Sequence, residues 1–187
     1  KLTLEDVMYA QDWGGEIKLI GSVKKCDDGK ILPMVRPAFV CNNNQLSNIS
    51  DVFNGVMVYG DGFDEVMFYG RGAGKLPTAS AVVADVIDCA KHTERRKFFG
   101  WENSIADYVV SYRDIKHPFF VRASYTDEAA AKQSIADLFG EVEYLTYEGA
   151  AANELGFITA AITQREFDEK IAKASLQVGS VIRVTDY

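Results

Sequence analysis

The order of hydrophobic and polar residues along the first half of the chain predicts a helix, two pairs of strands and a second helix. Residues 3–12 are typical of a short helix, with Thr3 as a suitable N-cap and Glu5 and Asp6 in the first turn, where the helix dipole favours acids. After Gly14, apolar residues alternate as they do in half-buried strands. The expected strands are 16–25, 31–40, 52–59 and 63–69, and the expected second helix is 78–91.

Turn residues and apolar spacing refine these elements. Gly29 can take the positive φ of a hairpin turn, whereas Pro33 and Pro37 indicate an edge strand or a bulge. Asn54 and Gly55 are expected to interrupt the third strand. One face of helix 78–91 carries the apolar side chains at helical spacing: Ala79, Val82, Val83, Val86, Ile87 and Ala90.

After a polar, irregular stretch, the second half of the chain has a different pattern of hydrophobic and polar residues. The expected elements are strand 119–125, helix 127–139, strands 142–147 and 155–163, helix 165–176 and strand 178–184. This βαββαβ order is the split βαβ or ferredoxin-like arrangement. The sequence therefore predicts an α+β protein with one domain at 1–92, a linker at 93–116 and a ferredoxin-like domain at 117–187.

Charge and cysteine usage narrow the function classes. The 187 residues carry a net charge of −7, and an acidic surface of this kind argues against a nucleic-acid partner. No apolar run approaches the roughly 20 residues that span a bilayer, and the N-terminus has no signal pattern. The scattered cysteines, Cys26, Cys41 and Cys89, predict reduced thiols in a cytoplasmic protein and no metal site. The start at Lys1, without Met, suggests an excised fragment.

The segment with the clearest chemistry is YGRGAGKLPTASAVV, residues 69–83. A strand, a glycine-rich loop and a helix follow one another there, so that backbone N–H groups and the positive end of the helix dipole favour an anionic or polar ligand. The loop is not a Walker A motif, because Leu76 follows Lys75, and it is not G-x-G-x-x-G, because Lys75 replaces the third glycine. From the pattern alone, a structural turn and a ligand contact are equally open.

The longer string YGRGAGKLPTASAVVADVIDCA resembles the homoserine dehydrogenase family, in which a GRGAGxxPTASAVVxD segment closes the catalytic core. The similarity covers about residues 2–92 and includes three further segments, Leu2–Val7, Glu16–Gly21 and Val52–Val56. The resemblance implies the mixed sheet and helices of that family's catalytic and dimerisation domain. It also implies reduction of L-aspartate 4-semialdehyde to L-homoserine with NADH or NADPH, in threonine, methionine and isoleucine biosynthesis.

The resemblance assigns cofactor contacts but no catalytic group. Gly74, with Gly72 and Ala73 beside it, lies where the family's loop contacts the nicotinamide nucleotide, and Thr78 opens the helix that packs on the nucleotide domain. The family's catalytic lysine, acidic substrate ligands and Rossmann domain precede the point where this chain starts. The isolated chain is therefore expected to be inactive and to bind NADP or NAD weakly.

Other charged residues are not expected to replace the missing catalysts. Arg71 is expected to be structural and Lys75 a solvated charge. Four more charged side chains are expected on the surface: Asp6, Glu16, Lys18 and Lys24.

Residues 117–187 resemble an ACT domain, a module that senses amino acids in biosynthetic enzymes and is associated with threonine feedback in long homoserine dehydrogenases. Where that family has D-x-P-G, this chain has TDEAAA at 126–131, without the glycine that allows close backbone approach. Threonine binding and a packing or dimerisation role both stay open. A free-standing amino-acid-binding module and a purely oligomerising protein are the alternative functions.

The loss of a nucleotide domain would uncover the apolar face of helix 78–91 and part of helix 3–12. Large exposed apolar surfaces are uncommon on soluble monomers. A homodimer that covers them is therefore expected.

Overall fold

The computed structural model describes residues 2–94, 100–103 and 107–185, which form two compact units. Unit 1 comprises residues 1–47 and 106–187, and unit 2 comprises residues 48–105. These units do not coincide with the expected domains 1–92 and 117–187, because the first strands join the sheet of the last ones. Part of the expected linker, 93–116, lies outside the described residues.

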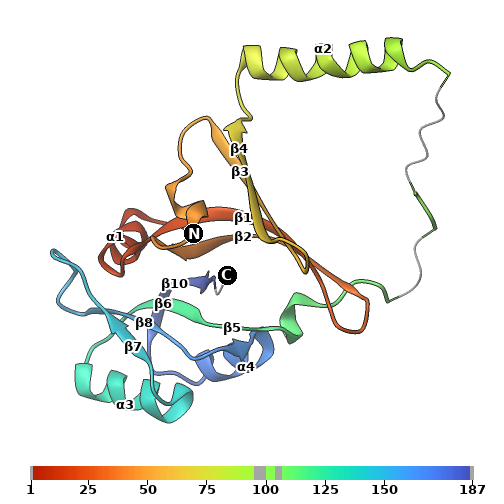
Figure 1. Cartoon of the computed structure of the whole chain (residues 1–187). Coiled ribbons are helices and arrows are strands. Elements are labelled where there is room, and N and C mark those ends of the chain that lie inside the picture. The colour runs from red at the N-terminus through yellow and green to blue at the C-terminus, as the bar shows by residue number, and fades with distance from the viewer. Residues whose placement is uncertain (1, 95–99, 104–106, 186–187) are drawn as a thin grey trace. The chain divides into compact units, whose positions relative to one another are not determined.

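Unit 1 is built on a six-stranded sheet (Figure 1). Its strands run in the order β1 (Gly15–Lys25), β2 (Ile31–Cys41), β10 (Gln177–Val184), β6 (Phe119–Ser124), β8 (Glu154–Ile158) and β7 (Glu143–Leu145). All neighbours are antiparallel except β2 and β10, which pair in parallel at Ala38 and Phe39. With α3 (Glu128–Phe139) and α4 (Gln164–Ile171), the last four strands have the predicted βαββαβ order.

Short elements complete unit 1. Strand β5 (Lys116–His117) pairs with β9 (Ile162–Thr163), and the 3-10 turns are η1 (Gln45–Asn48) and η2 (Tyr112–Asp114). The predicted hairpin turn at Gly29 is confirmed, with φ at 82° between β1 and β2. Pro33 and Pro37 pair only with β1, in the part of β2 that has no second neighbour.

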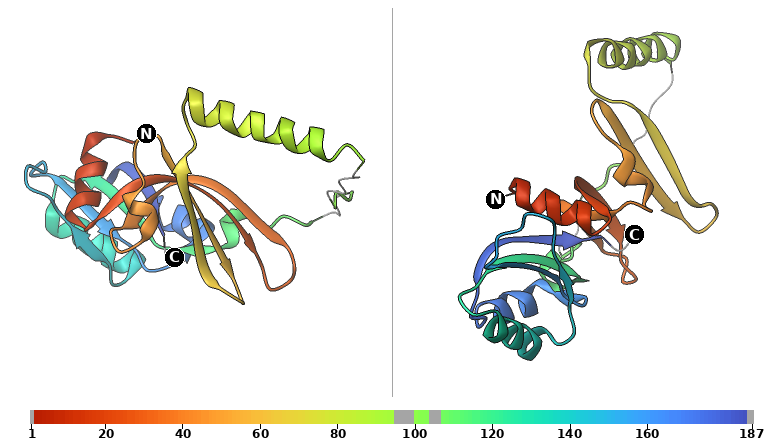
Figure 2. Two further views of the ribbon diagram at one scale, coloured as in Figure 1. Left: turned by 45° about the horizontal axis from the view of Figure 1, so that its top comes forward. Right: turned by 90° about the vertical axis from the view of Figure 1, so that its left-hand side faces the viewer.

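Helices cover both faces of this sheet. Helix α1 (Leu4–Asp12) lies on one face, and α3 and α4 lie on the other (Figure 2). Strand β6 shows how the sequence serves both faces, because successive side chains of a strand point to opposite sides. Phe119 and Val121 join the core beneath α3 and α4, whereas Phe120 packs with Tyr9 of α1 and with Phe39 of β2.

Gly156 allows α1 to approach the sheet. A Cβ atom at this position of β8 would lie 2.7 Å from a ring carbon of Tyr9 and 3.1 Å from one of Phe120. Tyr9 is completely buried, and this burial, with Glu154 nearby, raises the pKa of its hydroxyl above the usual range. The ring of Tyr9 thus occupies the space that a side chain at position 156 would need.

Asp6 corrects the expectation of a surface charge. Its side chain has no exposed surface and accepts hydrogen bonds from Arg122 Nε at 2.7 Å, Ser180 Oγ at 2.5 Å and the Thr3 backbone N–H at 2.9 Å. Arg122 also donates to Glu154 Oε2 at 2.9 Å. Burial lowers the pKa of Arg122, but the hydrogen bonds to these two carboxylates outweigh it and raise the pKa overall.

Unit 2 is a hairpin followed by a helix. Strands β3 (Phe53–Gly60) and β4 (Asp64–Arg71) pair from Phe53↔Arg71 to Gly60↔Asp64, and α2 spans Lys75–Lys91. None of the described residues of this unit is buried. A two-stranded hairpin is marginal in water by itself, so unit 2 depends on a further surface for its stability.

Some predicted boundaries were wrong for local reasons. Strand 155–163 is divided into β8 and β9, because the Thr159 hydroxyl accepts a hydrogen bond from the Phe119 N–H and donates to the Ala160 carbonyl. Helix 165–176 ends at Ile171, after which i→i+3 bonds replace the helical ones. Asn54 and Gly55 do not interrupt β3, since both are paired with β4.

The buried carboxylate of Asp6 gives a stability prediction. Asp6→Ala removes one of the two carboxylates that pair with Arg122 and the acceptor of the Ser180 hydroxyl, so we expect the free energy of unfolding of unit 1 to fall by about 3 kcal/mol. Urea unfolding can be followed through Trp13, which packs against Phe39, in a chain where exposed Trp101 is replaced by Phe.

Asp114→Ala is the matched control, because it breaks an exposed ion pair with Arg165. We expect only a small effect from this change. Equal losses in the two variants would contradict a special role for the buried carboxylate.

Candidate functional site

The glycine loop of unit 2 connects the end of β4, at Arg71, to the start of α2, at Lys75. Gly74 is the N-cap residue and has φ 121° and ψ 155°, a backbone conformation that is essentially restricted to glycine. The helix starts earlier than predicted: Thr78 lies within its first turn and donates its N–H to the Gly74 carbonyl at 3.1 Å.

Backbone donors at this helix start have no intrahelical partner. The N–H groups of Lys75 and Leu76 belong to the first turn, where the helix offers no carbonyl to them. Pro77 has no N–H, and Gly74 has no side chain that could cap the helix. The loop thus presents N–H groups and the positive helix end to an anionic or polar group.

Asn54 is a loop contact that the sequence reasoning missed. It pairs with Gly70 across the hairpin, and a Cβ atom on Gly72 would lie 2.3 Å from its amide nitrogen. The glycine at 72 therefore leaves room for Asn54 to lie against the loop. If residues 53 and 71 had been predicted to pair across the hairpin, the contact of Asn54 with the loop could have been identified from the sequence.

Aromatic side chains fix the strand ends beside the loop. The guanidinium of Arg71 lies 4.9 Å from the ring centroid of Phe53, which stacks on Tyr69 at a centroid distance of 4.9 Å. The cation–π contact gives Arg71 a packing role. Lys75 is exposed at the start of the helix.

The predicted cofactor contacts, Gly72, Ala73, Gly74 and Thr78, are all exposed, and Thr78 is linked to Gly74 by its backbone hydrogen bond. They can supply one wall of a binding site but no proton donor. Among the described residues, no group of three or more His, Cys, Asp or Glu side chains could hold a metal ion. No helix in the described part of the chain is long and apolar enough to cross a membrane.

A second candidate region lies in unit 1, where the expected effector loop follows β6. A pocket of about 430 Å³ is lined there by Ser124, Tyr125, Thr126, Asn153, Ala174, Ser175, Leu176 and Gln177. Asp127 is the N-cap of α3, and its carboxylate accepts the Ala130 N–H at 3.0 Å. A negative charge thus occupies this helix start, where it disfavours the binding of a second anion.

The conformation of Gly74 gives a prediction for the loop. We expect Gly74→Ala to destabilise the start of α2 by about 1–3 kcal/mol, because φ 121° is strained for any residue with a Cβ atom. Gly70→Ala is the control, since its added Cβ atom meets nothing within 4 Å. Hydrogen exchange of the Thr78 amide measures the difference, and unchanged exchange in Gly74→Ala would contradict it.

Comparison with known proteins identifies the family. The homoserine dehydrogenase family model matches residues 1–87. Homoserine dehydrogenase of Neisseria gonorrhoeae is 31% identical over 186 residues, which cover 92% of this chain and 42% of that protein. The Bacillus subtilis homoserine dehydrogenase is 33% identical over 147 residues, which cover 75% of this chain and 33% of that protein.

Solved structures agree over the whole chain. A homoserine dehydrogenase from Thiobacillus denitrificans has a TM-score of 0.77 at 25% identity and covers 99% of this chain, which spans 46% of it. The Staphylococcus aureus enzyme at pH 7.0 has a TM-score of 0.73 at 27% identity, with 100% of this chain and 46% of that chain covered. The chain thus spans less than half the length of these relatives. By sequence and by fold, the chain belongs to the homoserine dehydrogenase family and represents one part of such a protein.

Proposed function

We propose that this chain serves, within a complete protein, in the reduction of L-aspartate 4-semialdehyde to L-homoserine with NADH or NADPH. The observation that carries the proposal is the glycine loop, in which Gly74 has a conformation restricted to glycine and the following helix start offers free N–H groups. A nicotinamide nucleotide is anionic and polar, and it suits such a surface. The parent enzyme would act in threonine, methionine and isoleucine biosynthesis in the cytoplasm.

The residues of this loop would bind and orient the nucleotide. Gly72 and Ala73 would let the ligand approach the backbone, Gly74 would hold the turn, and Thr78 would anchor the first turn of α2. The nucleotide, when bound, supplies the hydride. Hydride transfer also needs a positioned proton donor, for which the loop has no group. We therefore expect the isolated chain to be inactive, with residues 1–92 as the enzyme segment and 117–187 as an appended ACT-like segment.

A homodimer is the proposed assembly. The apolar side chains of α2 are exposed along one face, among them Val82, Val83, Val86 and Ile87. The hairpin before it also exposes Val56, Phe68 and Tyr69. Apolar surface of this extent is uncommon on a soluble monomer, and a second copy or the rest of the enzyme would cover it.

A chimeric enzyme tests the proposed activity. When this chain replaces the matching 42% of the Neisseria gonorrhoeae enzyme, we expect aspartate semialdehyde to be reduced with NADPH or NADH, whereas the 187-residue chain alone gives no turnover. In the chimera, Gly74→Val should raise KM for the nucleotide about ten- to hundredfold, because a displaced loop no longer orients it.

Gly21→Ala in the same chimera is the control, since its added Cβ atom makes only an ordinary contact with Val35. We expect an unchanged KM for this variant. Turnover by the isolated chain, or an active chimera indifferent to Gly74→Val, would contradict the proposal.

Amino-acid sensing by unit 1 is the second candidate function. The polar pocket beside Thr126 and Asn153 favours it, because hydroxyl and amide groups can recognise an amino acid such as threonine. The Asp127 carboxylate at the start of α3 and the missing loop glycine oppose it. A packing or dimerisation role needs neither feature.

Calorimetry with L-threonine separates the two roles of unit 1. We expect no saturable heat at millimolar L-threonine, because Asp127 would repel its carboxylate. L-isoleucine and L-methionine are the comparison ligands. Saturable heat that is selective for threonine and lost in Asn153→Ala would instead establish unit 1 as a sensor.

A further inference from the structure

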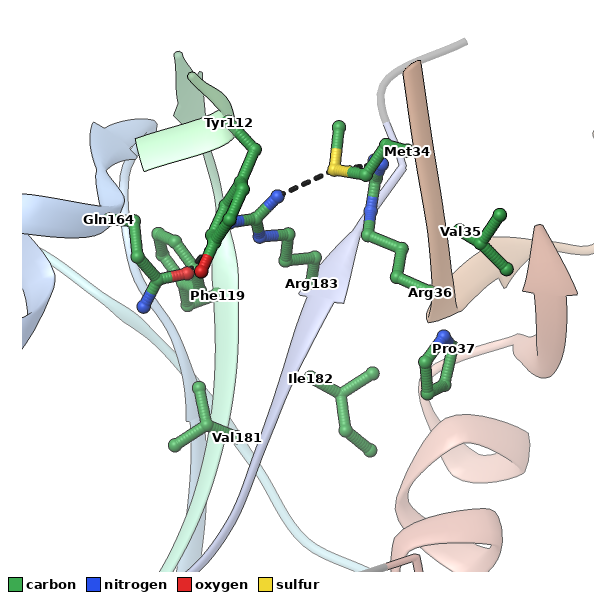
Figure 3. A pocket seen from close by; sticks show the side chains of 10 residues that line it. All are labelled: Met34, Val35, Arg36, Pro37, Tyr112, Phe119, Gln164, Val181, Ile182 and Arg183. Atoms are coloured by element: carbon green, nitrogen blue, oxygen red, sulfur yellow. Dashed lines mark hydrogen bonds between the residues drawn. The ribbon is translucent and has the colours of Figure 1, made fainter. Parts of the chain in front are cut away.

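Unit 1 has a further pocket, which shares no residue with the pocket beside Thr126 and Asn153. It has a volume of about 370 Å³ and is lined from β2, η2, β6, α4 and β10 (Figure 3). Its polar lining consists of Arg36, Tyr112, Gln164 and Arg183, with Met34 between the two arginines. No residue of the glycine loop contributes to it.

The two arginines of this pocket are more than nine-tenths buried. Arg36 is 7% exposed and Arg183 is 8% exposed. Arg and Lys side chains are almost never buried to this degree unless they are paired. A carboxylate or another anion is therefore expected beside them.

Neither guanidinium has an anionic hydrogen-bond partner among the residues that the structure describes. Arg36 and Arg183 each donate from Nη1 to the Met34 sulfur, at 2.8 and 2.7 Å, and a thioether is a weak acceptor. Arg183 also donates to Gln164 Oε1 at 2.7 Å and lies over the Tyr112 ring at 5.1 Å. Nε and Nη2 of Arg36 have no partner in the described part of the chain.

Asp168, whose charge acts on Arg183, is already engaged with other groups. Asp168 accepts hydrogen bonds from Arg113 at 2.6 Å and from the Gln164 amide at 2.9 Å. Burial and then the neighbouring positive charge of Arg36 lower the pKa of Arg183, although Asp168 opposes this. Two like charges thus share a buried region without a counter-charge in direct contact.

Another arginine of the same sheet shows how this protein neutralises a buried guanidinium. Arg122 donates to Asp6 at 2.7 Å and to Glu154 at 2.9 Å, so two carboxylates compensate its charge. Arg36 and Arg183 have the burial of such a residue but lack its carboxylates. An uncompensated buried charge is costly, and this cost is removed when an anion binds.

We propose that this pocket is a binding site for a small dianion, either a phosphate group or a dicarboxylate, held by Arg36 and Arg183. Guanidinium groups present paired N–H donors that match the oxygens of phosphate and carboxylate. Two positive charges match a dianion in charge. Val181, two residues before Arg183 on β10, and Phe119 would contact the less polar body of the ligand. The site is independent of the proposed dehydrogenase function, because all of its residues lie in unit 1.

Thermal unfolding of the 187-residue chain tests the site. Inorganic phosphate and succinate are titrated separately against chloride at constant ionic strength, so that screening is equal in all samples. We expect one of the two dianions to raise the Tm by about 5 °C or more at a hundredfold excess over its Kd. The more effective anion identifies the ligand as a phosphate compound or a dicarboxylate.

Arg36→Met and Arg183→Met are the decisive variants. Each keeps the side-chain bulk and removes one of the two charges, so in chloride we expect a Tm at least equal to that of the unchanged chain. Both variants should lose the stabilisation by phosphate or succinate. If the two arginines had only a structural role, their replacement would not leave the Tm in chloride normal and at the same time abolish the stabilisation by the anion.

Arg165→Met is the matched control, because it removes an exposed guanidinium that pairs with Asp114 and does not line the pocket. It should keep the full anion effect. Amide chemical shifts of Gln164 and Arg183 in the unchanged chain give a readout that needs no variant, and they should move saturably. No effect of either dianion, or an effect that persists in Arg36→Met, would overturn the proposal.

Discussion

The ion pair between Asp6 and Arg122 joins the first helix of the chain to a strand that begins more than a hundred residues later. The carboxylate is completely buried, so its hydrogen bonds must be satisfied inside the protein. Ser180 and the Thr3 N–H complete that requirement, and Glu154 completes the neutralisation of Arg122. The cluster helps to fix the position of α1 on the sheet, because a displacement of the helix would separate these paired groups.

Sequence periodicity predicted most elements of unit 1, since a strand or an amphipathic helix shows its buried face through its spacing. It did not predict that residues 1–47 and 117–187 share one sheet, because periodicity identifies a face and not its partner. Asp6 and Arg122 illustrate the limit. In the sequence Asp6 is an acid at an expected surface position, and only its meeting with Arg122 in space makes its burial favourable.

The candidate functional residues also differ in whether they could be identified from the sequence. The glycine loop could be found because the requirement at Gly74 is local: a backbone conformation that other residues adopt only under strain. Asn54 was missed because its contact with Gly72 comes from strand pairing. Arg36 and Arg183 were missed for the same reason, since they come from two parallel strands far apart in sequence and share no motif.

The two units therefore differ in how firmly contacts within the chain hold their candidate binding groups in place. Unit 1 has a hydrophobic core on each face of its sheet, so the positions of Arg36 and Arg183 are set by packing within the chain. Unit 2 has no buried residue among those described, so its loop geometry is supported only by the hairpin and by the helix start. A binding site needs supporting contacts that hold its groups in place. It follows that the glycine loop becomes rigid only when further protein packs on α2, whereas the arginine pocket is already organised in this chain.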